Sequence, residues 1–336
     1  MENTTFALCP DAATNLLKQW PNYAPTPIRR VANSMGNTKL LIKDETNRMR
    51  QGSFKAVGGG YAVARLVMGR ASKSKVMLSD LRENACDKTF ICASAGNHGV
   101  SVAAGAQYLG ASSRIHLSKR VPSEFITRLT RLGAKVIRSG ETYEDSVSCA
   151  IEDAAQGNGI HLADGSWPGY TEPPRLVMEG YTIIAEEMRL DFEQCGDWPS
   201  HVFLQAGVGG LAGAITYMIR KNWAVQPHIC VVEPDFAPCL HDSMKAGYLI
   251  DVQGPASNMG RLDCKTASLL AFEILSQKAD AFVTVSDQQA QLAAKALAAQ
   301  SVATTPSGAA GYAAFLQAKL DENSNALIIV TEGAIT

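Results

Sequence analysis

The sequence predicts an α/β protein with two domains, each built on a mostly parallel, twisted β-sheet. Three observations lead to this prediction. The chain has 336 residues, which is enough for two domains of ordinary size. Short apolar runs alternate with helical patterns throughout, and two of these runs lead directly into a glycine-bearing turn that opens a helix. Such alternation is typical of parallel βαβ units.

The expected elements follow one another in a regular order. Apolar runs predict strands at 40–43, 90–93, 114–117, 135–137, 202–204, 229–232 and 327–330. Helical patterns occupy 56–68, 100–109, 122–132, 143–155 and 211–220. We expect 87–160 to form a smaller inserted α/β domain, and 1–86 together with 161–336 to form the larger domain.

Composition argues against several classes of protein. The formal net charge is −1 and basic residues are spread along the chain, whereas a nucleic-acid surface needs a basic stripe. No run approaches the length of a membrane span, and residues 1–25 carry Glu2 and Asp11 and no apolar stretch typical of a signal peptide. The eight cysteines form no C-x-x-C pair and no metal spacing, so we expect no resident metal and a cytoplasmic location.

Lys55 is the first candidate functional residue. It follows Ser53 and Phe54 and precedes three glycines and an alanine-rich helical pattern. An apolar turn flanked by glycine is a poor place for a solvated charge. A buried lysine shifts its pKa readily, and a neutral amine can form a Schiff base. On its own, this lysine is a weak indication of catalysis.

A second candidate loop is Ser-Ala-Gly-Asn-His-Gly at 94–99, between an expected strand and an expected helix. Backbone amides at the start of a helix bind carboxylates and phosphates. The same residues also fit an ordinary capped turn, so this loop leaves both interpretations open.

The third loop, Gly-Val-Gly-Gly-Leu-Ala at 207–212, also joins a strand to a helix, and its glycines let the backbone approach a phosphate closely. It matches the G-x-G-x-x-A form of the dinucleotide fingerprint as well, with Glu233 at the end of the next strand as a ribose-binding acid. A nicotinamide oxidoreductase is therefore an alternative, although it leaves the loops of Lys55 and Asn97 without a function.

In order and spacing, the segments 53–55, 94–98 and 207–211 resemble the fold-type II pyridoxal-phosphate enzymes, the group of tryptophan synthase β and threonine dehydratase. Within that group the chain is most similar to diaminopropionate ammonia-lyase. The segments that carry this similarity are 21–28, 43–45, 164–170, 178–181 and 259–264. The stretch Asp-x-x-Trp-x-Gly-Tyr at 164–170 is the most specific, because generic threonine dehydratases lack it.

The resemblance implies pyridoxal 5′-phosphate as cofactor, held by the larger domain in a cleft between the two. Lys55 would bind it as a Schiff base and later remove the α-proton of the substrate. Phe54 would pack against the pyridine ring, Asn97 would bind the ring hydroxyl, and Thr331 would face the pyridine nitrogen. The cofactor phosphate would be bound by the backbone amides of Gly207, Val208, Gly209, Gly210 and Leu211.

The resemblance also implies substrate-binding residues. Ser94, Ala95 and His98 would lie near the substrate carboxylate. Asp164, in a pocket with Trp167 and Tyr170, would bind a second amine of the substrate, and it would protonate the departing nitrogen if burial raises its pKa. Outside the family, an acid at this position fits a helix cap or a surface loop equally well.

Two departures from the family pattern affect the expected chemistry. Ala95 stands where the lyases usually carry an aspartate as a second base, so we expect activity on L-amino acids through Lys55 alone. Glu233, Ala237 and Cys239 occupy positions at which some relatives bind a divalent cation. A thiol in place of a hard oxygen ligand argues against such a metal here.

We therefore expect a pyridoxal-phosphate-dependent β-elimination on a small L-amino acid. The first choice of substrate is 2,3-diaminopropionate, which gives pyruvate and ammonia. The alternatives are a dehydratase acting on serine, threonine or another 3-hydroxy amino acid, a β-replacement enzyme, and a non-catalytic relative that binds the cofactor for regulation. From the family we also expect a homodimer.

Overall fold

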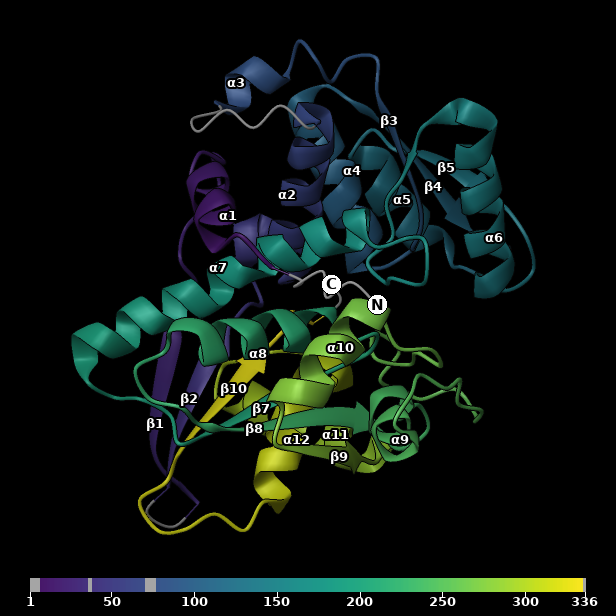
Figure 1. Cartoon of the computed structure of the whole chain (residues 1–336). Coiled ribbons are helices and arrows are strands. Elements are labelled where there is room, and N and C mark those ends of the chain that lie inside the picture. Colours follow the sequence, from purple (N-terminus) through teal and green to yellow (C-terminus); the bar gives the residue numbers. More distant parts are fainter. Residues whose placement is uncertain (1–6, 36–37, 70–76, 335–336) are drawn as a thin grey trace. The chain divides into compact units, whose positions relative to one another are not determined.

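The computed structural model describes residues 7–35, 38–69 and 77–334. The chain divides into two compact units. Unit 1 comprises Met1–Tyr23, Lys55–Asp164 and Glu172–Ile183, and unit 2 comprises Ala24–Phe54, Gly165–Thr171 and Ile184–Thr336. Each unit contains one β-sheet with helices packed against it, which confirms the predicted α/β class (Figure 1).

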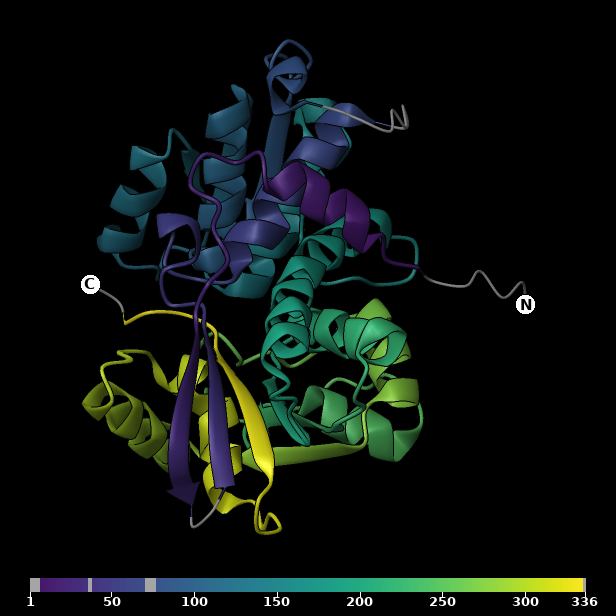
Figure 2. The same cartoon turned by 90° about the vertical axis from the view of Figure 1, so that its left-hand side faces the viewer.

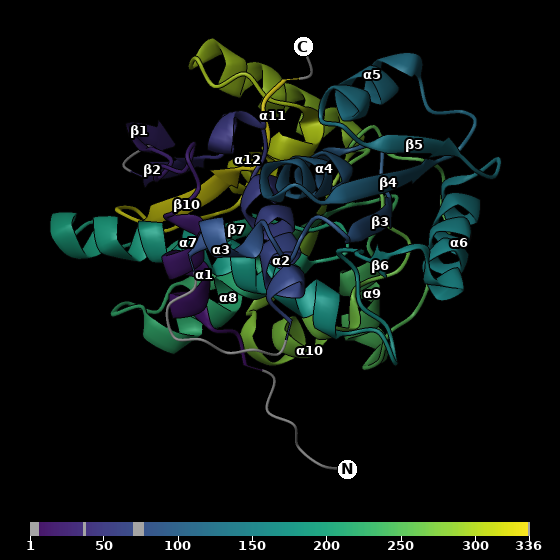
Figure 3. The same cartoon turned by 90° about the horizontal axis from the view of Figure 1, so that it is seen from above.

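Unit 1 is built on a four-stranded parallel sheet in the order β5-β4-β3-β6. Its strands are β3 (Thr89–Ala93), β4 (Ser112–Leu117), β5 (Lys135–Arg138) and β6 (Ile160–His161). Its helices are α1 (Pro10–Leu17), α2 (Lys55–Met68), α3 (Leu78–Leu81), α4 (Asn97–Leu109), α5 (Ser123–Arg131), α6 (Tyr143–Asp153) with a π-turn at Ala154–Asn158, and the first half of α7 (Glu172–Cys195). Helices α4 and α6 cover opposite faces of this sheet (Figure 3).

Glycine explains why α2 belongs to unit 1. A Cβ atom at Gly105 of α4 would lie only 3.0 Å from the Cα atom of Gly60 of α2, and one at Gly59 would lie 2.0 Å from Oγ of Ser101. The two helices therefore approach each other more closely than larger side chains would permit. The unit that contains the smaller sheet is larger than the expected inserted domain of 87–160, because it also includes Met1–Tyr23, residues 55–86 and 161–164, and Glu172–Ile183.

Unit 2 is built on a six-stranded sheet in the order β1-β2-β10-β7-β8-β9. Its strands are β1 (Ile28–Met35), β2 (Thr38–Asp44), β7 (His201–Gln205), β8 (His228–Pro234), β9 (Ala281–Val285) and β10 (Asn325–Val330). Its helices are α8 (Gly210–Asn222), α9 (Cys239–Ala246), α10 (Leu269–Lys278), α11 (Asp287–Ala299), α12 (Pro306–Gln317), a 3-10 turn at Arg48–Arg50 and the second half of α7. Among the described strands of this sheet, only the edge strand β1 is antiparallel to its neighbour β2, and β2 lies between β1 and β10 (Figure 2).

The core of unit 2 lies on both faces of its sheet. Helices α11 and α12 cover one face and α8 and α10 the other (Figure 3). Inward-facing side chains such as Leu40, Phe203, Val232 and Ile328 are at most 4% exposed. This continuous apolar character is typical of parallel strands that are covered on both faces. In the described part of the chain, no helix is long and apolar enough to cross a membrane.

Candidate active site

Lys55 and Asp164 form an ion pair in unit 1. Lys55 is the first residue of α2, and Asp164 follows the carboxyl end of β6. Their side chains are 20% and 24% exposed, so both charges are largely withdrawn from water. Burial opposes both charged forms, but the mutual attraction outweighs it, so the pKa of Lys55 is raised and the pKa of Asp164 is lowered. The pair is therefore an ammonium and a carboxylate at neutral pH.

His98 lies near this pair. Its ring is 5% exposed, and Nε2 lies 2.8 Å from the carbonyl oxygen of Leu162, to which it donates. Burial lowers the pKa of His98, against the attraction of Asp164, so the ring is neutral. Nδ1 has no hydrogen-bond partner among the described residues. A buried acceptor nitrogen beside a carboxylate and an ammonium gives this end of the sheet a strongly polar character.

The turn at 94–99 has the geometry of an anion site. Gly96 precedes α4 and provides no side-chain cap, while its own amide donates to Oγ of Ser94 at 3.2 Å. A Cβ atom at Gly99 would lie 2.0 Å from the carbonyl oxygen of Ser94, so the turn requires glycine there. Ser94, Ala95 and Asn97 are partly exposed. The first amides of α4 lack intrahelical partners and are suited to a carboxylate or an oxyanion.

The loop at 207–211 forms a similar cradle in unit 2. Gly209 precedes α8 with a φ of +95°, which favours glycine, and no side chain caps the helix. A Cβ atom at Gly207 would lie 3.0 Å from Sγ of Cys264 and 3.1 Å from the carbonyl oxygen of Arg261, so a larger residue would require these neighbours to move. An uncapped helix start with a glycine approach fits a phosphate group.

Thr331 lies at the same edge of the sheet of unit 2 as this loop. It follows β10, which pairs in parallel with β7, and the loop at 207–211 follows β7. Its side chain is buried, and Nε2 of Gln205 donates to its hydroxyl at 3.3 Å. The amide of Phe54 donates to the Thr331 carbonyl at 3.0 Å, which fixes the residue before Lys55. Ligands of parallel sheets bind at the carboxyl ends of strands, where these residues lie.

Trp167 and Tyr170 also belong to unit 2 and form a small hairpin. Their backbones exchange hydrogen bonds of 3.2 and 2.9 Å, and their rings are stacked with centroids 4.3 Å apart. The preceding Ser166 is anchored by Oγ of Ser268 at 2.7 Å. The two rings are thus held as a rigid aromatic surface. Their grouping with Asp164 in one pocket stays a prediction, because Asp164 belongs to unit 1.

The structure gives Glu233 a different place from a ribose-binding acid. Its side chain is fully buried and accepts the amides of Leu240 and His241, at the start of α9, at 2.8 and 2.7 Å. The thiol of Cys239 lies 3.5 Å from Oε1 of Glu233. Glu233 is therefore occupied with holding α9, which removes the main support for the nicotinamide alternative.

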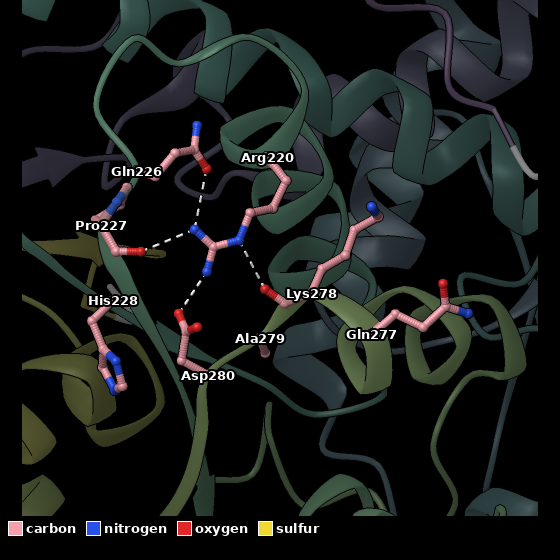
Figure 4. A pocket seen from close by; sticks show the side chains of 8 residues that line it. All are labelled: Arg220, Gln226, Pro227, His228, Gln277, Lys278, Ala279 and Asp280. Atoms are coloured by element: carbon pink, nitrogen blue, oxygen red, sulfur yellow. Dashed lines mark hydrogen bonds and ion pairs between the residues drawn. The ribbon is translucent and has the colours of Figure 1, made fainter.

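A surface cavity of about 570 Å³ contains none of the expected site residues (Figure 4). It lies in unit 2 at the amino ends of β8 and β9, beside His228 and Asp280. The guanidinium of Arg220 already donates to Asp280, Gln226 and the carbonyls of Pro227 and Lys278. Because these bonds occupy the charge, and because ligands bind at the opposite ends of parallel strands, we do not assign the active site to this cavity.

Sequence reasoning missed two residues that support the site. Tyr181 of α7 lies beside Lys55, with Nζ 5.8 Å from the ring centroid. Gln205, at the end of β7, donates to Thr331 and to the carbonyls of Gly308 and Ile329 at 3.0 and 2.8 Å. Both contacts join segments far apart in the sequence. The only sequence signal was that Tyr181 falls within a stretch that resembles the ammonia-lyases.

Comparison with known proteins agrees with this geometry. Residues 20–332 match the family model "Pyridoxal-phosphate dependent enzyme". The chain is 35% identical over 283 residues to the diaminopropionate ammonia-lyase of Escherichia coli K12, covering 82% of this chain and 71% of that protein. It is 31% identical over 353 residues to the enzyme of Salmonella typhimurium, covering 94% and 87%. It is 28% identical over 274 residues to the L-serine dehydratase/L-threonine deaminase of Bos taurus, covering 80% and 75%.

Solved structures give the same result. The crystal structure of Escherichia coli diaminopropionate ammonia-lyase in complex with D-serine superimposes with a TM-score of 0.86 at 29% identity, covering 96% of this chain and 88% of that one. A threonine deaminase from Solanum lycopersicum shares the fold, with a TM-score of 0.79 at 21% identity and coverage of 97% and 88%. The loop at 207–211 fits a phosphate, and Lys55 can form a Schiff base with a carbonyl group. In agreement with these features, this chain belongs to the pyridoxal-phosphate-dependent enzyme family, and its cofactor is pyridoxal 5′-phosphate.

Proposed function

We propose that this lyase eliminates ammonia from L-2,3-diaminopropionate, giving pyruvate and two molecules of ammonia after hydrolysis. The observation that carries the proposal is the ion pair of Asp164 with Lys55. In this pair the carboxylate of Asp164 already binds one ammonium group, that of Lys55 itself, which supports a role of Asp164 in binding an amine of the substrate. The ammonia-lyase relatives of 31–35% identity support the same choice.

Different residues of the proposed site would bind the cofactor, bind the substrate and accept the proton. The bound cofactor withdraws electrons from the substrate Cα and so makes its proton acidic. Nζ of Lys55, released from the cofactor as a neutral amine while Asp164 pairs with the substrate, would accept that proton. The amides at the start of α8 would hold the cofactor phosphate, and those at the start of α4 would hold the substrate carboxylate. The hydroxyl of Thr331 would bind the pyridine nitrogen, and the amide of Asn97 would bind the ring hydroxyl.

Asp164 acts as a carboxylate rather than as an acid. Asp164 would donate a proton only if burial raised its pKa, but the charge of Lys55 outweighs burial and lowers the pKa. An ionised Asp164 stabilises the β-amine of the substrate as an ammonium group. The Cβ–N bond then breaks with its electron pair moving to nitrogen, and the group leaves as neutral ammonia without further proton transfer.

A dehydratase remains the second candidate, since the similarity to the bovine L-serine dehydratase supports it. The turn Ser-Ala-Gly-Asn at 94–97 supports it as well. A β-replacement enzyme would share the first half of either reaction. In a dehydratase the leaving group is a hydroxyl, which has no positive charge for Asp164 to stabilise.

The test is an ammonia and 2-oxo acid assay on the holoenzyme with L- and D-2,3-diaminopropionate, L-serine, L-threonine and L-threo-3-hydroxyaspartate. We expect turnover of the L-diamine. Asp164→Asn should lower its kcat/KM by about a hundredfold, because a close charge pair is lost. Asp153→Asn is the matched control, since Asp153 is a buried acid of unit 1 paired with Arg114 and His116 instead. Turnover of the hydroxy acids alone would identify a dehydratase.

We also propose that the protein is a cytoplasmic homodimer that takes part in amino-acid degradation and binds neither nucleic acid nor membranes. No disulfide forms among the eight cysteines in the described part of the chain, which supports a reducing compartment. Light scattering of the purified holoenzyme measures the mass in solution. A mass of one chain would contradict the dimer.

A further inference from the structure

Tyr181 occupies a buried position beside the cofactor lysine. It lies in the half of α7 that belongs to unit 1, as do Lys55 and Asp164. Its side chain is 1% exposed, and Nζ of Lys55 lies 5.8 Å from the centroid of its ring. Burial raises the pKa of the Tyr181 phenol, against the attraction of Lys55, so it remains protonated at neutral pH. A neutral phenol beside an ammonium offers it a hydroxyl oxygen and a π-face.

Two glycines make this position possible. A Cβ atom at Gly58 of α2 would lie 2.2 Å from Cε1 of Tyr181, so the ring occupies the space that a side chain would fill. A Cβ atom at Gly180 would lie 2.6 Å from the carbonyl oxygen of Val57. Glycine inside a helix is less favourable than alanine, so two such positions at one crossing indicate a specific requirement. They seat the Tyr181 ring against the first turn of the helix that carries Lys55.

A second buried tyrosine at the same crossing shows what a structural tyrosine looks like here. Tyr61 of α2 is fully buried, and its hydroxyl donates to Glu179, which also pairs with Arg65. Its hydroxyl is thus part of an ionic cluster that joins α2 to α7. Tyr181 instead places its ring next to the reacting amine.

The proposed function creates a need for a residue at this place. When Asp164 binds the ammonium group of the substrate, it no longer balances the charge of Lys55 alone. Lys55 becomes an ammonium later in the reaction, once it has accepted the α-proton, while Asp164 is still engaged by the substrate. A partner that remains beside Nζ throughout then keeps the lysine in position.

We propose that Tyr181 is a positioning residue that holds Nζ of Lys55 while Asp164 is engaged by the substrate. The proposal rests on the proposed function only for the role of Asp164 and for Lys55 as the cofactor lysine. Because the phenol stabilises the ammonium form, its removal leaves more of Lys55 as the neutral amine. Neutral amine attacks the aldehyde of the cofactor, so the loss of the hydroxyl has opposite effects on cofactor capture and on turnover.

The test compares Tyr181→Phe with Tyr61→Phe, which removes a buried hydroxyl at the same crossing. The rate at which cofactor-stripped protein captures pyridoxal 5′-phosphate is followed by visible absorbance at pH 8. We expect Tyr181→Phe to capture the cofactor several times faster and to lower kcat between about ten- and a hundredfold. Tyr61→Phe should change neither rate more than about twofold. Thermal unfolding shows whether each variant is folded.

Gly58→Ala provides a second variant, since it keeps both phenols but moves the ring of Tyr181 away. We expect it to lower kcat in the same way as Tyr181→Phe. A Tyr181→Phe variant that captures the cofactor at the rate of the unchanged protein, or more slowly, would overturn the proposal. If no amino acid in the panel is turned over, the proposed function fails, whereas the capture rate still decides the role of Tyr181.

Discussion

Lys43 and Lys55 are both lysines paired with carboxylates, yet their surroundings differ. Nζ of Lys43, on β2, is 2.6 Å from Oε2 of Glu187 and 2.7 Å from the carbonyl of Thr26, and the side chain is 1% exposed. Both terminal nitrogens of Arg48 also donate hydrogen bonds to the carboxylate of Glu187, each at 2.7 Å. Lys55 stands at the first position of a helix, is 20% exposed, and lies beside an acid and a phenol.

Burial alone therefore does not distinguish a reactive lysine from a structural one. Lys43 is enclosed by a network in which two cations share buried acids, so its ammonium is fixed and its removal would leave an uncompensated charge. Under our proposals, Asp164 beside Lys55 exchanges the lysine for the substrate, whereas the phenol of Tyr181 stays in place. Gly58 of the same helix leaves room for the ring of Tyr181. A reactive lysine is therefore recognised by exchangeable partners.

The largest expected effect is on kcat, which should depend on Lys55 far more than on Lys43. Lys55→Ala should lower kcat by at least about ten-thousandfold, because the base and the attachment point of the cofactor are lost together. Lys43→Met should retain turnover within about tenfold per folded molecule. Steady-state kinetics, normalised to the folded fraction from circular dichroism, measures both. An active Lys55→Ala protein would break the comparison.

A measurement of the free energy of unfolding tests the structural role of the buried network around Lys43. Glu187→Gln should lower the free energy of unfolding by about 3–5 kcal/mol, since Lys43 and Arg48 would be left with too little negative charge in a buried place. Glu193→Gln is the control on the same helix. Its carboxylate is 44% exposed and pairs with Arg189, so we expect a loss under about 1 kcal/mol. Urea denaturation gives both values, and equal losses would contradict the account.

Asp164 and Glu187 pair with lysines, whereas the buried acid Glu233 is held by backbone amides. Burial raises its pKa to about 7 from the ordinary 4.5, although the amides of Leu240 and His241 oppose the shift. Between pH 4.5 and about pH 7 the carboxyl group of Glu233 is ionised in the unfolded chain but still protonated in the folded protein. The free energy of unfolding therefore falls as the pH rises through this interval. The loss amounts to at most about 3 kcal/mol. Urea unfolding at pH 5 and pH 8 should show this decrease, and Glu233→Gln should abolish it, whereas the exposed Glu273→Gln should not.

The smallest expected effect concerns the face of the cofactor opposite Lys55. Ala95 has no side chain that can exchange a proton, so under the proposed function Lys55 would be the only base. Ala95→Asp should raise the ratio of D- to L-2,3-diaminopropionate turnover by about tenfold, because a carboxylate supplies a second base. Initial rates on both enantiomers measure this ratio. Equal rates on both enantiomers in the unchanged protein would contradict the single-base hypothesis.

The sequence was sufficient for the interior of the fold. All seven expected strands lie within strands of the structure, because buried parallel strands are apolar along their whole length. The strands that were missed are β1, β6 and β9. Strand β1 lies at a sheet edge and carries polar residues, and β6 has only two residues, so neither has a continuous apolar signal. Strand β9 lies at the other edge of the sheet of unit 2, and its one polar residue is Thr284.

The loops of the site were also predictable, because glycine and polar residues between a strand and a helix have few alternatives. The place of α2 was not, since it depends on its contact with α4 through Gly60 and Gly105. The contact of Tyr181 with Lys55 depends in the same way on packing between α2 and α7. Such tertiary contacts leave no periodic signal in the sequence. The ionised state of Asp164 likewise required the geometry of its pairing with Lys55.

The central claim is that Lys55, and not the more deeply buried Lys43, carries the cofactor. Borohydride reduction of the holoenzyme fixes the cofactor to its lysine, and mass spectrometry of the peptides then locates it. The account predicts the label on Lys55 alone, with Lys43 unmodified. A label on Lys43 or on any other lysine, or a holoenzyme that reduction leaves unlabelled, would contradict it.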